Sequence, residues 1–267
     1  MRKFEIPVWT GCPPFASGVN SDDVPVIDVY LPDAAVNTGF GMLAFPGGGY
    51  SFLSEKSGQQ YGEWFAERGV AVFVVKFRLG SRGFDFRAKC ADAYAALALV
   101  RERAAGWGLE RQSIGVIGTS AGGHLAGVLC TGAGRAVLQS EGVTEFTDVA
   151  QLPAFGVFCY GVLTLLDPLA HWETRANFLG GWRGDAAIEL AFSPIQAAHA
   201  GCPRSFIWHT AEDQEVPAEH SWQFARRLND VRVPHELHLY QKGGHALGLA
   251  RDGGLHWADD CQRWIVG

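Results

Sequence analysis

The chain has 267 residues, a formal net charge of −6, and a composition that is 48% hydrophobic and 12% aromatic. This apolar content is enough for a sizeable core and excludes an intrinsically disordered chain. The negative charge, without any cluster of basic residues, argues against nucleic acid and anionic membranes as partners, and no apolar run is long enough to span a bilayer.

The N-terminal segment predicts no secretory signal. Met1-Arg-Lys-Phe-Glu-Ile-Pro7 begins with basic residues but continues without the apolar segment that such a signal requires. We therefore expect a cytoplasmic protein, with a processed secreted form as the alternative.

Short runs rich in β-branched and aromatic residues predict seven strands, at residues 24–31, 40–45, 70–77, 113–117, 154–160, 204–210 and 235–240. The third run is continuously apolar, which is typical of a strand covered on both faces of a parallel sheet. Five helical stretches alternate with these runs, at residues 57–68, 87–105, 121–130, 218–229 and 255–265. This alternation predicts one α/β domain over residues 1–267, with a mostly parallel central sheet, helices on both faces and an antiparallel N-terminal edge.

Two stretches interrupt the alternation. Residues 131–150 are polar and contain glycine, and we expect a surface excursion there. Residues 161–200 show no clean period and follow a central strand at the end of the sheet where substrate-facing insertions collect. We expect them to form a small cap-like insertion or pocket wall.

The stretch Gly118-Thr-Ser-Ala-Gly122 has the pattern G-x-S-x-G, with an apolar strand before it and a helix of small residues after it. In this context the pattern predicts a nucleophile elbow, in which a tight turn presents Ser120 at a helix N-terminus. Glycine suits the two flanking positions because a Cβ there would collide with the neighbouring strand or helix. The pentapeptide alone does not exclude a glycine-rich turn with an incidental serine.

An earlier loop has the composition of an oxyanion-binding segment. The apolar strand 40–45 runs into Pro46 and three consecutive glycines. A backbone N–H can point into a site only where no side chain blocks it, which favours glycine. We expect the N–H of Gly48 or Gly49 to complement that of Ala121 in an oxyanion hole.

Two later loops contain the candidate partners of Ser120. Glu212, Asp213 and Glu215 follow the sixth predicted strand, and each could supply the acid. His245 lies in a glycine-flanked loop after the last strand. The order serine, acid, histidine is that of the α/β-hydrolase arrangement.

Other histidines fit structural roles better. His209 lies in a buried strand and is expected to be a hydrogen-bonded core residue, and His124 at the start of the helix after Ser120 is expected to pack or cap. His235 and His238 are three residues apart on a strand, so they point to opposite faces.

The six cysteines form no C-x-x-C pair, which predicts reduced core thiols: Cys12, Cys90, Cys130, Cys159, Cys202 and Cys261. The chemistry expected of Ser120 requires no cofactor, and no residue spacing predicts a metal site.

From about residue 26 onward, the chain resembles the α/β-hydrolase esterases of the acetyl-xylan-esterase and acetylesterase type, which are related to the dienelactone-hydrolase-like group. The resemblance lies in Asp28-Val-Tyr-Leu-Pro32, Phe45-Pro-Gly-Gly-Gly-Tyr50, Val75-Lys-Phe-Arg-Leu79, Gly118-Thr-Ser-Ala-Gly-Gly-His-Leu125, residues 171–180 and Gly243-Gly-His245. One departure is Phe77, where this group is expected to have tyrosine.

The resemblance implies an α/β-hydrolase fold and, because the family has aspartate ahead of Val-Pro, Asp213 as the triad acid. It also implies a serine carboxylesterase that removes small acyl groups, acetyl above all, from xylan-derived or other carbohydrates. The expected partner is thus a small-molecule or oligosaccharide ester. Tyr50, Tyr160 and His171 are the expected substrate-binding residues, with Trp172 and Trp182 as further candidates for the pocket wall.

Several alternatives remain open at this level. Within the same class they are a feruloyl esterase, a lipase-like enzyme, another small-ester carboxylesterase or a peptidase. A different class is a non-catalytic binding protein on the same fold, because a fold does not determine a function. The insertion 161–200 is short and contains bulky tryptophans, which does not favour the long amphipathic lid of a lipase.

Overall fold

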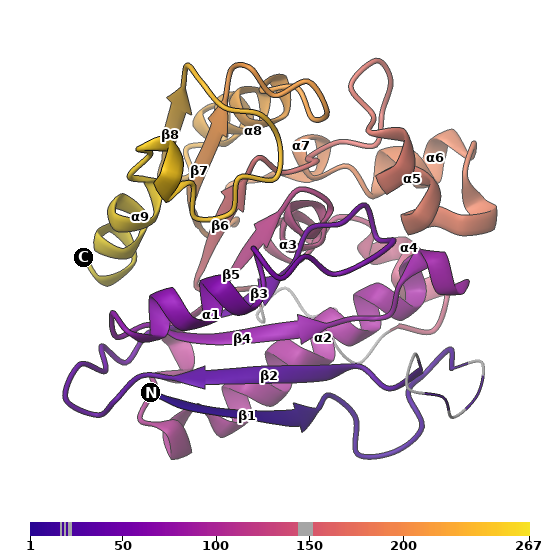
Figure 1. Ribbon diagram of the computed structural model, residues 1–267. Helices are drawn as coiled ribbons and strands as arrows, with labels where there is room; N and C mark the ends of the chain where they lie inside the picture. Colours follow the sequence, from indigo (N-terminus) through magenta and orange to yellow (C-terminus); the bar gives the residue numbers. More distant parts are fainter. Residues whose placement is uncertain (17, 19, 21–22, 144–151) are drawn as a thin grey trace.

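The computed structural model describes residues 1–16, 18, 20, 23–143 and 152–267. Within them, eight strands form one sheet in the order β1-β2-β4-β3-β5-β6-β7-β8 (Figure 1). The strands are β1 Arg2–Pro7, β2 Val26–Leu31, β3 Gly41–Phe45, β4 Ala71–Lys76, β5 Ile114–Thr119, β6 Phe155–Cys159, β7 Arg204–Thr210 and β8 His235–Tyr240.

The sheet is parallel from β4 to β8, whereas β2 pairs antiparallel with both β1 and β4. The expected mostly parallel sheet with an antiparallel N-terminal edge is therefore confirmed. The sequence pattern does not predict β1, because Ile6 is its only buried residue and no alternation marks it. This strand depends on edge pairing with β2, from Arg2 opposite Leu31 to Pro7 opposite Val26.

The α-helices lie between the strands and beyond them: α1 Gln59–Ala66, α2 Phe86–Arg103, α3 Ala121–Thr131, α4 Arg135–Ser140, α5 Trp172–Leu179, α6 Ala186–Ala191, α7 Pro194–Ala197, α8 Glu219–Asp230 and α9 Trp257–Val266. In the part of the chain that the structure describes, no helix combines the length and apolarity that a membrane span needs.

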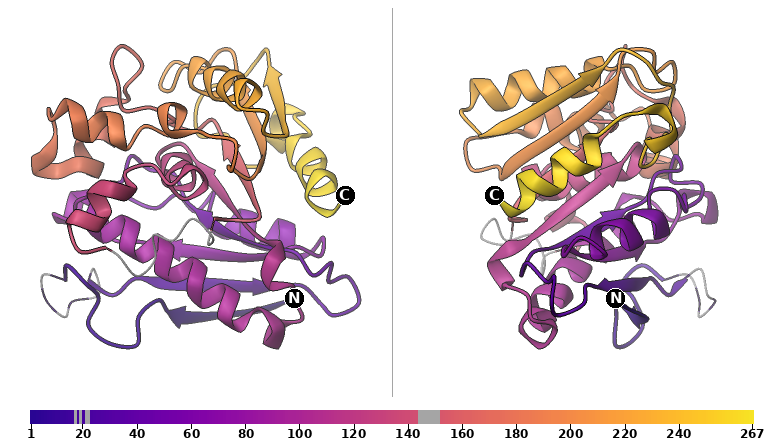
Figure 2. Two further views of the ribbon diagram at one scale, coloured as in Figure 1. Left: turned by 180° about the vertical axis from the view of Figure 1, so that it is seen from behind. Right: turned by 60° about the vertical axis from the view of Figure 1, so that its left-hand side comes forward.

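Helices cover both faces of the sheet, as expected (Figure 2). Apolar side chains of α2, α3 and α8 pack on one face with Leu43 and Phe45 of β3. Those of α1 and α9 pack on the other face with Met42 and Ala44 of the same strand. The alternation along β3 thus divides its side chains between two cores, because successive residues of a strand point to opposite faces.

The two interrupting stretches contain helices that the sequence pattern does not predict. Residues 161–200 form α5, α6 and α7, and Phe178, Leu179 and Phe192 of this insertion are buried in the core, so that only part of it can act as a cap. The stretch 131–150 includes the short helix α4. Its residues 144–150 lie outside the described residues.

A buried ion pair joins the end of β4 to α2. Arg78 follows the strand and donates from Nε to Asp92 Oδ2 at 2.9 Å and from Nη2 to Asp92 Oδ1 at 2.7 Å. The indole N–H of Trp9 donates to the same carboxylate at 3.0 Å. Only 1% of the Arg78 side chain and 0% of the Asp92 side chain are exposed, so each charge depends on the other for solvation.

Asp92→Asn removes the negative partner and leaves a buried guanidinium, so we expect the free energy of unfolding to fall by about 3–5 kcal/mol. Glu67→Gln is the matched control, because it breaks an exposed pair with Arg68 and should cost less than about 1 kcal/mol. Urea denaturation followed by circular dichroism measures both. Equal costs for the two variants would contradict a structural role for the buried pair.

Candidate active site

Ser120 occupies the sharp turn between β5 and α3. Its φ of +54° lies in the left-handed region, which non-glycine residues rarely adopt without a constraint from their surroundings. A Cβ at Gly118 would lie 2.2 Å from the carbonyl oxygen of Gly122, and one at Gly122 would lie 1.9 Å from that of Phe45. Only glycine fits these two positions, so the predicted elbow geometry is present.

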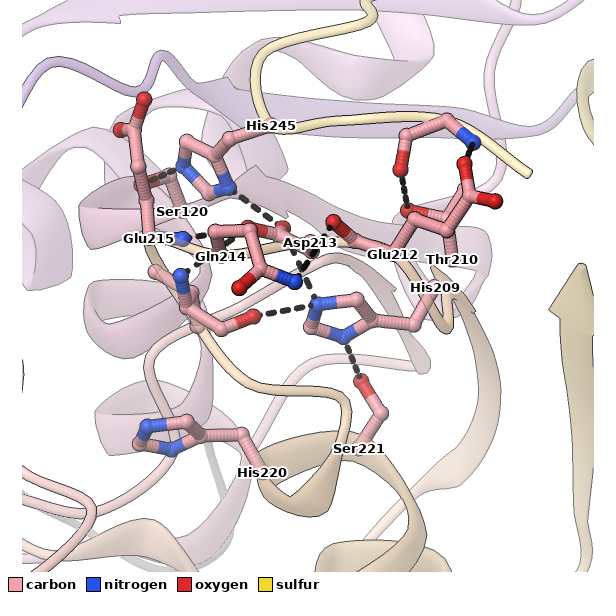
Figure 3. Close-up of polar contacts among 12 residues, drawn as sticks. Ser120, His209, Thr210, Glu212, Asp213, Gln214, Glu215, His220, Ser221 and His245 are labelled. Carbon is pink, nitrogen blue, oxygen red and sulfur yellow. Dashed lines mark hydrogen bonds and ion pairs between the residues drawn. The ribbon is translucent and has the colours of Figure 1, made fainter. Parts of the chain in front are cut away.

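The structure brings Ser120, His245 and Asp213 into one hydrogen-bonded series (Figure 3). His245 Nε2 lies 2.8 Å from Ser120 Oγ, and His245 Nδ1 lies 2.6 Å from Asp213 Oδ2. With Nδ1–H donating to the carboxylate, Nε2 is left to accept the hydroxyl proton. Ser120 and Asp213 are 7% and 5% exposed, which shields the series from bulk water.

Asp213 is held in its ionised form by a full set of donors. Its Oδ1 accepts from the backbone N–H groups of Glu215 and Val216, each at 3.0 Å, and its Oδ2 faces both His245 and His209. Burial by itself would raise the pKa of the Asp213 carboxyl. The hydrogen bonds from the two histidines and from the Val216 N–H outweigh it and hold the pKa well below the ordinary value.

The neighbouring acids make other contacts. Glu212 accepts from the backbone N–H of Gly243 at 3.2 Å, and Glu215 lines a cavity next to Ser120 that is described below. Of the three acids on this loop, Asp213 is the one in hydrogen-bond contact with His245.

The glycine loop after β3 borders the same space. Gly48 has a φ of +131°, and a Cβ there would lie 2.3 Å from the carbonyl oxygen of Phe52. The N–H of Gly47 donates to Ser57 Oγ, while the N–H groups of Gly48 and Gly49 have no acceptor among the described residues. Ala121 is the first residue of α3, so its N–H also lacks a partner within the helix. These unpaired donors beside Ser120 can bind a developing oxyanion.

A small cavity of about 130 Å³ opens above Ser120. Its walls are Gly47, Gly48, Gly49, Phe52, Ser54, Ser57, Thr119, Ser120, Tyr160, His171, Glu173, Glu215, His245 and Ala246. The Tyr160 ring packs edge-on against His245 at 5.0 Å, and the Tyr160 hydroxyl accepts from the N–H of Gly248. Both predicted residues Tyr160 and His171 therefore line the cavity.

His171 presents a free ring nitrogen. Its Nδ1 is bonded to Thr174 Oγ1 at 2.9 Å, and its Nε2 has no protein partner among the described residues. Burial lowers the pKa of His171, which favours the neutral imidazole. Glu173 lies next to it, with Oε1 accepting from Ser51 Oγ at 2.7 Å and the other oxygen close to Gly49. The sequence contains no motif that identifies Glu173, because its position depends on how the insertion folds.

Tyr50 does not belong to the pocket, which corrects the sequence prediction. Its φ of +59° turns the ring away from the cavity and into the core, where it is 1% exposed. Its hydroxyl bonds His124 Nδ1 at 2.9 Å, and its ring packs against Phe77 and Phe178. The interpretation of His124 as a packing residue fits this contact.

The two tryptophan candidates also lie elsewhere. Trp172 is 70% exposed, and Trp182 packs against Phe86 in the core. Neither lines the cavity above Ser120.

Nothing in the described part of the chain gathers three or more side chains that could hold a metal ion. All six cysteines are free thiols, and Cys12 is the exposed one. His238 stacks on Phe206, and His235 bonds the carbonyl of Val233.

Comparison with known proteins identifies the family. The BD-FAE family profile matches residues 27–228. The chain is 27% identical over 240 residues to an acetylxylan esterase from Xylanibacter ruminicola, covering 88% of this chain and 46% of that protein. It is 26% identical over 213 residues to endo-1,4-beta-xylanase B from Butyrivibrio fibrisolvens, covering 79% of this chain and 33% of that protein. The chain thus spans less than half the length of these two curated relatives.

A solved structure matches over nearly the whole chain. It is the acetyl ester-xyloside bifunctional hydrolase from Caldicellulosiruptor lactoaceticus, with a TM-score of 0.85, 30% identity and coverage of 99% of this chain and 96% of that one. The expected α/β-hydrolase fold is confirmed by this likeness and by the mostly parallel sheet. The chain belongs to the BD-FAE family.

Proposed function

We propose that this chain is a serine carboxylesterase that hydrolyses small acyl esters, acetyl esters above all, through a Ser-His-Asp acyl-enzyme mechanism. The observation that carries the proposal is the series from Ser120 Oγ through His245 to Asp213, set beside unpaired backbone donors. The names of the acetylxylan esterase relative and of the acetyl ester-xyloside hydrolase of known structure support the same reaction class.

His245 acts as the base that the reaction requires. A serine hydroxyl is a weak nucleophile near neutral pH, so His245 Nε2 takes the proton as Ser120 Oγ attacks the ester carbonyl. Asp213 keeps the proton of the imidazole on Nδ1 and stabilises the imidazolium that forms. His245 then returns its proton to the leaving alcohol, and water hydrolyses the acyl-enzyme by the same route.

The negative charge that develops on the carbonyl oxygen meets the N–H of Ala121 and that of Gly48 or Gly49. One such donor contributes about 3–4 kcal/mol of transition-state stabilisation. The N-terminus of α3 adds a partial positive charge beside Ser120.

The walls of the cavity favour a small acyl group and a hydroxylated alcohol. A volume of about 130 Å³ suits a short acyl chain. Glu173, Glu215 and His171 offer hydrogen-bonding atoms near Ser120, and carboxylates accept readily from hydroxyl groups. We infer that the alcohol part is a carbohydrate such as a xylan-derived oligosaccharide, which agrees with the named activity of the acetylxylan esterase relative.

Ser120→Ala should lower kcat for p-nitrophenyl acetate by a factor on the order of 10⁶ with the fold unchanged, because only binding and the oxyanion donors then remain. Circular dichroism and thermal unfolding confirm the fold, and release of p-nitrophenol measures turnover. Wild-type turnover by a folded variant would disprove the assignment, and an inactive wild-type protein would favour the non-catalytic alternative.

Asp213→Asn should lower kcat by about 10⁴-fold, since asparagine imposes the wrong tautomer on His245. Glu212→Gln is the matched control on the same loop, because Glu212 bonds the Gly243 N–H and does not line the cavity, and it should keep kcat close to that of the wild type. The same p-nitrophenyl acetate assay decides. A severe loss in Glu215→Gln with an active Asp213→Asn would assign the acid to Glu215.

Among p-nitrophenyl esters, kcat/KM should be highest for acetate, lower for butyrate and lowest for octanoate, because longer chains exceed the cavity. The carbohydrate substrate is tested by measuring acetate released from acetylated xylo-oligosaccharides. Highest efficiency on octanoate would exclude the small-acyl reading, and preferential release of ferulate from feruloylated oligosaccharides would favour the feruloyl esterase alternative.

A further inference from the structure

A second imidazole lies against the carboxylate of Asp213, on the side opposite His245 (Figure 3). His209 lies on β7, and its Nε2 is 3.2 Å from Asp213 Oδ2 and 2.9 Å from the carbonyl oxygen of Val216. On the far side of the ring, Nδ1 is 2.7 Å from Ser221 Oγ of α8. His209 and Ser221 are both 0% exposed.

The direction of these hydrogen bonds follows from their partners. A carbonyl oxygen can only accept, so the contact with Val216 requires a proton on His209 Nε2. That N–H also faces Asp213 Oδ2 and is shared between the two oxygens. The other ring nitrogen, Nδ1, is bonded to the hydroxyl of Ser221. Both ring nitrogens of His209 are therefore satisfied, which is the condition for a stable buried polar group.

These hydrogen bonds fix the loop after β7, which contains Asp213, at two points. Asp213 Oδ1 is held by the N–H groups of Glu215 and Val216, and Oδ2 is shared by the two histidines. The bond from His209 to the Val216 carbonyl also ties the end of the loop to β7. Rotation of the carboxylate away from His245 would therefore break several hydrogen bonds together.

We propose that His209, oriented by Ser221, is the positioning residue of the triad acid: it holds Asp213 Oδ2 on His245 Nδ1 as the imidazolium forms. This role rests on the proposed esterase function. The catalytic benefit of positioning Asp213 is preorganisation, because a carboxylate that is already aligned need not reorient when charge develops on His245. His209 does not line the cavity, so it acts through Asp213 and should affect kcat rather than KM.

Three variants test the proposal. His209→Leu removes the donor, His209→Gln keeps an N–H donor near the position of Nε2, and Ser221→Ala removes the hydroxyl that orients the ring. Ser205→Ala is the matched control, because Ser205 is also buried and lies four residues earlier on β7, roughly 13 Å along the strand. For each variant, kcat and KM on p-nitrophenyl acetate and the melting temperature are measured on folded protein.

We expect His209→Leu to lower kcat by about 10–100-fold with KM unchanged, a loss similar to that for outer-shell partners of metal-bound imidazoles. His209→Gln should recover most of this loss. The kcat of Ser221→Ala should lie between those of His209→Leu and His209→Gln, and Ser205→Ala should keep the wild-type kcat. A fall in melting temperature with kcat unchanged in His209→Leu would show a merely structural core residue and overturn the proposal.

A readout that needs no turnover separates this proposal from the proposed function. The Nδ1 proton of His245, bonded to Asp213, is expected as a downfield resonance in the proton NMR spectrum of the wild type. It should broaden or move upfield in His209→Leu and remain in Ser205→Ala. An inactive wild type would refute the esterase function while the resonance still tests the positioning. If His209→Leu does not fold, Ser221→Ala decides. A kcat equal to that of the wild type, together with an unchanged resonance of the His245 Nδ1 proton, would overturn the proposal.

Discussion

The close approach of α3 to the end of β3 is the constraint on which the site depends. A Cβ at Gly122 would lie 1.9 Å from the carbonyl oxygen of Phe45, so helix and strand meet with no side chain between them. The loop that follows Phe45 is thereby brought beside the first turn of α3. The free N–H groups of Gly48 and Gly49 belong to residues that border the space above Ser120, and Ala121 begins α3 directly after Ser120. One packing contact therefore places both the candidate nucleophile and the candidate oxyanion donors.

The position of Asp213 depends on hydrogen bonding rather than on close backbone packing. A carboxylate as buried as Asp213 is stable as an anion only if donors replace its lost hydration. Two backbone N–H groups of its own loop and two imidazoles, from β7 and from the loop after β8, supply them. The carboxyl ends of these parallel strands lie at one edge of the sheet, where Ser120 also lies. The sheet topology therefore brings together groups that are far apart in the sequence.

The insertion between β6 and β7 supplies part of the cavity wall, whereas Ser120, Asp213 and His245 all lie outside it. Its buried residues, such as Phe178, anchor α5 in the core, and the N-terminal end of that helix places His171 and Glu173 in the cavity wall beside the glycine loop. A Cβ at Gly49 would lie 2.9 Å from the Glu173 carboxyl carbon, which shows how closely the insertion approaches the oxyanion donors. The shape of the cavity is thus tied to the tertiary packing of a segment without a sequence period.

The sequence by itself determined the strands β7 and β8 with their observed bounds, the elbow at Ser120 and the order of the three candidate triad residues, because strand pattern and glycine requirements are local. Only the tertiary structure decided that Tyr50 enters the core and that His209 reaches Asp213. The direction of a side chain after a glycine turn depends on backbone angles set by distant packing. His209 and Asp213 are only four residues apart, but their contact is completed by Ser221 of α8 and by His245 of the loop after β8. These long-range conditions have no local signature in the chain.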